Sequence, residues 1–110
     1  MRSQAIVCLL LGLVCTNGFS KEYEISQKNT NFSIPFLVIK PGDSVRFTNK
    51  DKVTHNVVSR TAEFEFDLGA FKPGMTKLVK FNHLGVVDVE CTIHPYMHMS
   101  IFLLKRNTDE

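Results

Sequence analysis

The sequence predicts an all-β protein, a Greek-key β-sandwich of about seven to eight strands. Three observations support this prediction. Short segments rich in Val, Ile, Phe and Thr recur along the chain, turn-forming Gly, Pro, Asn and Asp separate them, and no segment of useful length has helical periodicity. The 110 residues contain no repeat and no low-complexity stretch. A single domain is therefore expected.

The first twenty residues are expected to be a secretory signal peptide outside this domain. Arg2 precedes an uncharged apolar run, residues 5–15, and small residues follow it. We expect cleavage near Gly18 or Ser20 and take residues 21–110 as the mature domain. The apolar run is short for a membrane span. A retained membrane anchor is the alternative, and only in that form do we expect the protein to contact a membrane.

The mature domain is expected to open with an edge strand. Tyr23 and Ile25 alternate with polar residues, which indicates one buried face, and residues 29–31 end the pattern. The next apolar run, residues 32–39, is interrupted by Pro35. Because proline cannot donate to a strand ladder, this run is expected to be a bent or edge segment followed by a second strand.

The middle of the chain predicts two further strands. Residues 40–43, Lys-Pro-Gly-Asp, have the composition of a turn, and Val45 and Phe47 then alternate with polar residues in a half-buried strand. A polar loop follows. Val57 and Val58 indicate a short apolar strand after that loop.

The second half of the chain continues the same design. Residues 63–67 alternate acids with phenylalanines, and residues 76–81 and 100–105 have the composition of strands. In the strand of residues 86–91, Val87, Val89 and Cys91 alternate with two acids, so the thiol of Cys91 at its end is expected to point inward.

The charge of the chain excludes one class of function. Without Arg2, twelve basic side chains stand against eleven acidic ones, a net charge of +1. A balance so close to zero argues against binding to nucleic acid through a basic face.

Cys91 is the only cysteine of the expected mature domain. Small exported domains normally pair their cysteines, so an unpaired thiol needs a reason. Metal ligation is one, because a coordinated thiolate is deprotonated and occupied. An inert buried cysteine is the alternative.

The residues around Cys91 favour the metal. His94 follows three positions later, Met97 and Met99 each offer a thioether, and His55 lies far enough upstream to come from another strand. Two imidazoles and a thiolate with a weak axial thioether are the donors of blue-copper sites. The pattern therefore predicts a copper site.

The mature chain resembles the cupredoxins, the small blue-copper fold, and most of all their amicyanin, pseudoazurin and plastocyanin branches. The matching segments, in order and at family spacing, are residues 38–51, 55–58, 66–69, 72–76 and 85–97. The resemblance implies one type 1 copper ion and transfer of single electrons between redox partners by Cu(II)/Cu(I) cycling. It also implies a bacterial periplasmic location.

The same resemblance implies the ligands. His55, Cys91 and His94 match the equatorial ligands, and Asn56 is expected to tie the two ligand loops together. Met97 occupies the axial position of amicyanin, and Met99 that of pseudoazurin and plastocyanin. We take Met97 as the axial ligand, because the Cys-x-x-His-Pro-x-Met spacing is that of amicyanin.

By resemblance, the ring edge of His94 reaches the surface and serves as the electron port. Weak, transient docking of redox partner proteins is expected there. The apolar side chains expected around it are Phe36, Leu68, Phe71, Pro73 and Tyr96. We expect a monomer without catalytic activity, since the sequence has no identifiable nucleophile and base pair.

Three other interpretations remain open. A periplasmic copper carrier or chaperone would use the same ligand set but give up its metal readily. Zinc also binds one Cys and two His. The third is a metal-free adhesion module, in which the spacing of these residues is coincidental.

Overall fold

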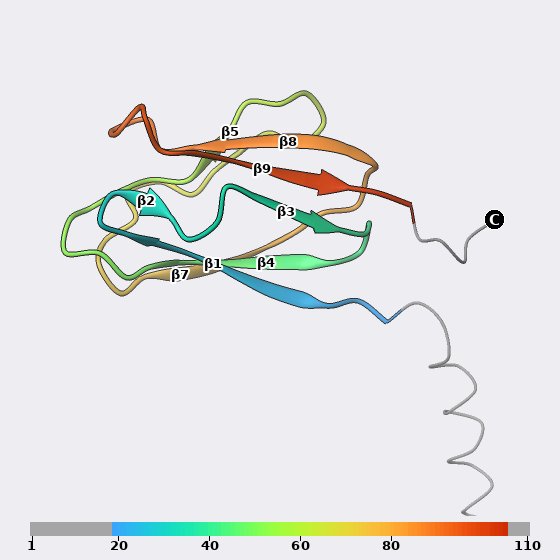
Figure 1. Ribbon diagram of the computed structural model, residues 1–110, viewed down its shortest axis with the longest axis horizontal. Coiled ribbons are helices and arrows are strands. Elements are labelled where there is room, and N and C mark those ends of the chain that lie inside the picture. The colour runs from blue at the N-terminus through green and yellow to red at the C-terminus, as the bar shows by residue number, and fades with distance from the viewer. Residues whose placement is uncertain (1–18, 106–110) are drawn as a thin grey trace, which may run out of the picture.

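The computed structural model describes residues 19–105, which form two packed β-sheets (Figure 1). The strands are β1 (Glu22–Lys28), β2 (Asn31–Phe32), β3 (Phe36–Ile39), β4 (Ser44–Asn49), β5 (Val58–Ser59), β6 (Phe66–Asp67), β7 (Thr76–Lys80), β8 (Gly85–Glu90) and β9 (His98–Leu103). Within this part of the chain no helix is long and apolar enough to cross a membrane. The expected signal peptide lies almost wholly outside the described residues and stays a prediction.

The sheets confirm the predicted all-β sandwich. One sheet has the strand order β2-β1-β4-β7, and the other has β3-β9-β8-β5-β6. The prediction that the first strand is an edge strand is wrong, because β1 lies between β2 and β4. The two-residue β2 was not recognisable as a strand. It folds back on β1 through a turn in which Asn29 and Thr30 both have positive φ.

The alternation that predicted the strands also builds the core. Val45 and Phe47 of β4 and Val87 and Val89 of β8 are fully buried, while the residues between them are not. Cys91 continues the inward positions of β8 and is also fully buried. The sulfur is therefore delivered to the interior by the period of the strand, as expected.

The two ends of the sandwich carry different segments (Figure 1). At the end that we call the site end, the loop between β8 and β9 meets the loop between β4 and β5. The opposite, distal end is formed by Lys21 and by residues 40–43, 81–84 and 104–105, where β1 and β8 begin and β3 and β9 finish.

Candidate metal centre

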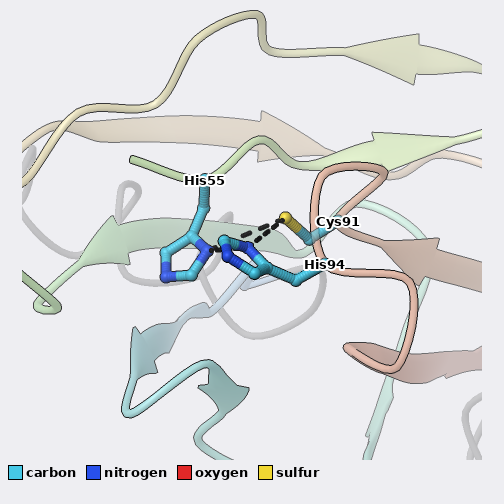
Figure 2. Close-up of side chains that lie close together, drawn as sticks. All are labelled: His55, Cys91 and His94. Carbon is cyan, nitrogen blue, oxygen red and sulfur yellow. Dashed lines mark hydrogen bonds between the residues drawn. The ribbon is translucent and has the colours of Figure 1, made fainter. Parts of the chain in front are cut away.

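The three residues expected as equatorial ligands converge at the site end (Figure 2). The Nδ1 atoms of His55 and His94 are 3.1 Å apart, and Sγ of Cys91 lies 3.7 Å and 3.6 Å from them, respectively. A point equidistant from these three atoms is about 2 Å from each, close to the roughly 2.0–2.3 Å bonds that imidazole nitrogen and thiolate sulfur make with zinc. The three donors therefore fit around one first-row transition-metal ion.

The donor set selects among metals. Hard cations such as Ca²⁺ and Mg²⁺ prefer oxygen ligands, whereas two imidazoles and a thiolate are borderline to soft donors that suit copper or zinc. His55 and Cys91 are buried and His94 is partly buried. The site thus lies just beneath the surface, with one ligand facing outward.

The loop that carries Cys91 and His94 consists of two consecutive turns. The His94 N–H donates to the Cys91 carbonyl at 3.2 Å, and the Met97 N–H donates to the His94 carbonyl at 2.8 Å. The Cys91 N–H then donates to the Met97 carbonyl at 3.2 Å and closes the loop. Pro95 follows His94, the position in a turn where its fixed φ is favourable. The loop is short and bonded to itself, so the two ligands are held firmly.

The two candidate axial methionines have different surroundings. Met97 belongs to the ligand loop and is 1% exposed. Met99 lies in β9 and pairs with Val89 across the ladder, and both methionines belong to the hydrophobic core. The strand position of Met99 matches the expectation that it is a core residue.

The backbone of His55 is anchored on both sides. Its N–H donates to the Phe71 carbonyl at 3.0 Å, and its carbonyl accepts from the Phe71 N–H at 2.8 Å. The side-chain amide of Asn49 donates to the same Phe71 carbonyl at 2.8 Å. His55 therefore sits on a fixed bridge although it lies outside the strands.

Asp51 lies near the site, although from the sequence it was expected only to belong to a polar loop. Its Oδ2 is 2.9 Å from Nε2 of His55 and also accepts the Thr30 N–H at 2.8 Å. A hydrogen on Nε2 can be donated to this carboxylate, which leaves the lone pair of Nδ1 free toward Cys91. The Thr30 amide, then His55 and the Lys52 amide, hold the pKa of Asp51 well below its usual range. No sequence pattern marks Asp51, because a separation of four residues in a loop does not by itself bring two side chains together.

Asn56 ties the two ligand loops together, as expected. Its Oδ1 accepts the Thr92 N–H at 2.7 Å, and its Nδ2 donates to the Thr92 hydroxyl at 2.5 Å. Its backbone N–H points at Sγ of Cys91 at 3.5 Å. From the opposite sheet, the buried Gln27 donates Nε2 to the Asn56 carbonyl at 3.1 Å. The surroundings of the sulfur are thus fixed from both sheets.

The surface beside His94 differs in one respect from the expectation. Phe71 is wrong as a surface residue, because it is fully buried in the core while its backbone pairs with His55. Tyr96 is 64% exposed, and its ring is set edge-on to that of His94 with centroids 6.2 Å apart. Ile93 is 53% exposed in the same loop. Apolar side chains therefore do flank the outward-facing ligand.

The fold and the site together place the protein in a class, the small metal-binding β-sandwich proteins. Its sandwich carries a Cys–His–His cluster at one end. The family model of copper binding proteins, the plastocyanin/azurin family, matches residues 20–104. The chain therefore belongs to this copper-binding family, whose small members are the cupredoxins, and the predicted family and metal are confirmed.

Relatives support this assignment. The chain is similar to amicyanin-alpha of Methylorubrum extorquens, with 32% identity over 77 residues that cover 67% of this chain and 65% of that protein. Among solved structures, a purple cupredoxin from Nitrosopumilus maritimus superposes with a TM-score of 0.67 at 22% identity, covering 74% of this chain and 99% of the other.

One structural neighbour is part of an enzyme. The copper-containing nitrite reductase of Thermus scotoductus superposes with a TM-score of 0.71 at 21% identity. The match covers 82% of this chain but only 23% of the reductase. The likeness is thus one of fold within a single module of a larger protein, and it does not extend to the reaction of that enzyme.

Proposed function

We propose that this chain is a small exported blue copper protein that carries single electrons between redox partners. The observation that supports this most strongly is the triangle of Nδ1, Sγ and Nδ1 atoms, whose size fits one first-row transition-metal ion. Membership of a copper-binding family supplies the identity of the metal.

The proposed ligands are His55, Cys91 and His94 in the equatorial plane and Met97 at the axial position. When bound, copper supplies a one-electron couple. The chain's own residues keep the geometry constant: the turns of the ligand loop, the Phe71 bridge and the Asn56 contacts all restrain the ligands. A rigid ligand frame suits electron transfer, because little structural change then accompanies each change of oxidation state.

Electrons are proposed to enter and leave through His94. This ligand is only partly buried, and the exposed Tyr96 and Ile93 flank it. Small apolar surfaces of this kind suit weak contacts that form and separate quickly. The partners are proposed to be redox proteins that dock here on the monomer.

The location is proposed from the sequence. Residues 1–20 have the pattern of a signal peptide, and residues 21–110 form the exported domain in this proposal. The similarity to amicyanin-alpha, a bacterial protein, favours the periplasm.

Repeated redox cycling tests the function against that of a copper carrier. The copper-loaded protein is reduced with ascorbate and reoxidised with ferricyanide in the presence of bicinchoninate, a chelator of Cu(I). An electron carrier retains its copper, so the Cu(II) spectrum returns in full over several cycles. Transfer of the copper to the chelator during the first reduction would instead favour a carrier. Asn56→Ala is a useful comparison, since a loosened ligand loop should release copper faster.

A further inference from the structure

The outer face of the second sheet is apolar over its distal half. The strand registers place Val38, Phe102 and Val86 next to one another across β3, β9 and β8. The residues of this distal face are Val38, Leu84, Val86, Phe102 and Leu104. Four of them are between 46% and 56% exposed, and Phe102 lies half-buried among them. Phe36, opposite Ser100 in the ladder, has its ring edge-on to that of Phe102. Continuous exposed apolar area of this kind marks an interaction surface.

The same sheet face is polar toward the site end. Ser100 donates to Asp88 at 3.3 Å, and Arg60 pairs with Glu90, which lies opposite His98. A second copy packed along the whole sheet would therefore cover these charged groups together with the apolar ones. The occupant must instead fit an apolar patch confined to the distal half.

Four lysines surround the distal end, and we call them the basic rim: Lys21, Lys40, Lys80 and Lys105. Lys21 and Lys80 both neighbour Ser44. The Ser44 N–H donates to the Lys21 carbonyl at 2.9 Å, and Ser44 lies opposite Lys80 in the ladder of β4 and β7. Leu104 donates its N–H to the Ile39 carbonyl at 3.0 Å, so the residues that follow them, Lys105 and Lys40, lie close together. Lys40 and Lys105 therefore border the distal face, and Lys21 and Lys80 lie at the same end of the molecule on the first sheet.

The acidic groups at this end are already paired. Glu22 accepts a hydrogen bond from Arg46 at 2.6 Å. Asp43 is 1% exposed and accepts the backbone N–H groups of Lys21 and Lys40, each at 2.9 Å. It also lies 4.0 Å from the Lys40 ammonium. Among the described residues, the distal end keeps an excess of positive charge next to an apolar surface.

We propose that the distal face and the basic rim bind the surface of an anionic phospholipid bilayer. Apolar side chains that enter the headgroup boundary, bordered by lysines that meet anionic lipids, are the two elements of interfacial membrane binding. Lys40 and Lys105, which lie beside this apolar face, carry the charge that complements anionic headgroups, and this argues for a bilayer as the occupant. Bound in this way, the protein holds its site end away from the membrane. The proposal does not depend on the metal.

A tryptophan reporter tests this orientation. The chain contains no tryptophan, so each substitution creates a single reporter. Val86→Trp places it on the distal face and Val53→Trp places it at the site end, and the two valines are matched in exposure at 46% and 44%. Both variants, prepared as residues 21–110 without the expected leader, are mixed with vesicles of phosphatidylcholine and phosphatidylglycerol at 3:1. Brominated lipids serve as quenchers.

We expect the emission of Val86→Trp to shift to shorter wavelength and to be quenched, and that of Val53→Trp to do neither. Equal responses from both reporters, or none from either, would overturn the proposal. A shift of Val86→Trp that grows with protein concentration without vesicles would also overturn it, because the occupant is then a second copy.

The rim has its own test. In the Val86→Trp background, Lys40→Glu and Lys105→Glu should each weaken binding to anionic vesicles about fivefold or more, because each lysine near a charged membrane surface contributes about 1 kcal/mol. Lys52→Glu, an exposed lysine in the loop at the site end, is the matched control and should have no comparable effect. Equal weakening by all three substitutions would contradict a specific role of the distal rim.

Discussion

The side chain of Asn56 joins the loop of His55 to the loop of Cys91. It makes two hydrogen bonds with Thr92, so Asn56→Ala should lower the free energy of unfolding by about 1–2 kcal/mol and shift the reduction potential by changing the surroundings of the sulfur. Chemical denaturation and voltammetry measure the two effects. Thr92→Val is the control, because it removes the hydroxyl but keeps the backbone N–H that Asn56 accepts. If both variants shifted the potential equally, the effect of Asn56 on the copper site would not depend on its hydrogen bond with the Thr92 backbone N–H.

The two methionines allow a second test at the residue scale. Met97→Leu should raise the reduction potential, because the thioether donates electron density that favours Cu(II). Met99→Leu should leave the potential unchanged and cost less than about 1.5 kcal/mol of stability, as expected for a volume-conserving core substitution. Voltammetry of both variants measures this. The opposite pattern would move the axial ligand to Met99.

The metal-binding side chains could be predicted from the sequence more readily than the residues that hold them in place. The thiolate, thioether and imidazole donors at the family spacing can be recognised from the sequence alone, whereas the role of Asp51 depends on the fold. Its carboxylate is brought to Nε2 of His55 by the loop and to the Thr30 amide by the turn after β1. Phe71 shows the same limit, since its apolar character suggested a surface role beside His94 and the β-bridge to His55 places it in the core.

At the scale of elements, the start of β8 depends on Gly85. Its φ is +146°, and a Cβ there would lie 3.1 Å from the Phe64 ring. Gly85→Ala should therefore cost about 1–3 kcal/mol through backbone strain and crowding. Gly74→Ala is the control, because Gly74 also has positive φ, at +88°, but a Cβ there would meet nothing within 4 Å. Thermal unfolding of both variants measures the difference. Equal losses would show that the contact with Phe64 is unimportant.

The longer strands were predictable because alternation is a property of the sequence alone. In β4 and β8 every second residue is buried, as the pattern of Val and Phe indicated. The strands that pair with a given strand cannot be predicted from the residues of that strand alone. The parallel pairing of β1 with β4, and the two-residue β2 that covers its other edge, depend on how the chain returns through space. An edge position could therefore not be assigned from Tyr23 and Ile25.

At the scale of the whole molecule, the sandwich separates two kinds of surface. The ligands and the exposed Tyr96 lie at the site end, and the distal face and basic rim lie at the other. Rigid sheets between the ends keep this separation fixed. A protein built in this way can exchange electrons at one end while the other end stays in contact with a bilayer.

The absorption spectrum after addition of Cu(II) tests the central claim, that Cys91 and the two histidines form a blue copper site. Wild type and Cys91→Ser are measured in parallel, with Met99→Leu as a control outside the proposed ligand set. We expect an intense thiolate-to-copper band toward the red end of the visible spectrum, retained in Met99→Leu and lost in Cys91→Ser. Copper binding without that band in the wild type, or a band that survives in Cys91→Ser, would contradict it.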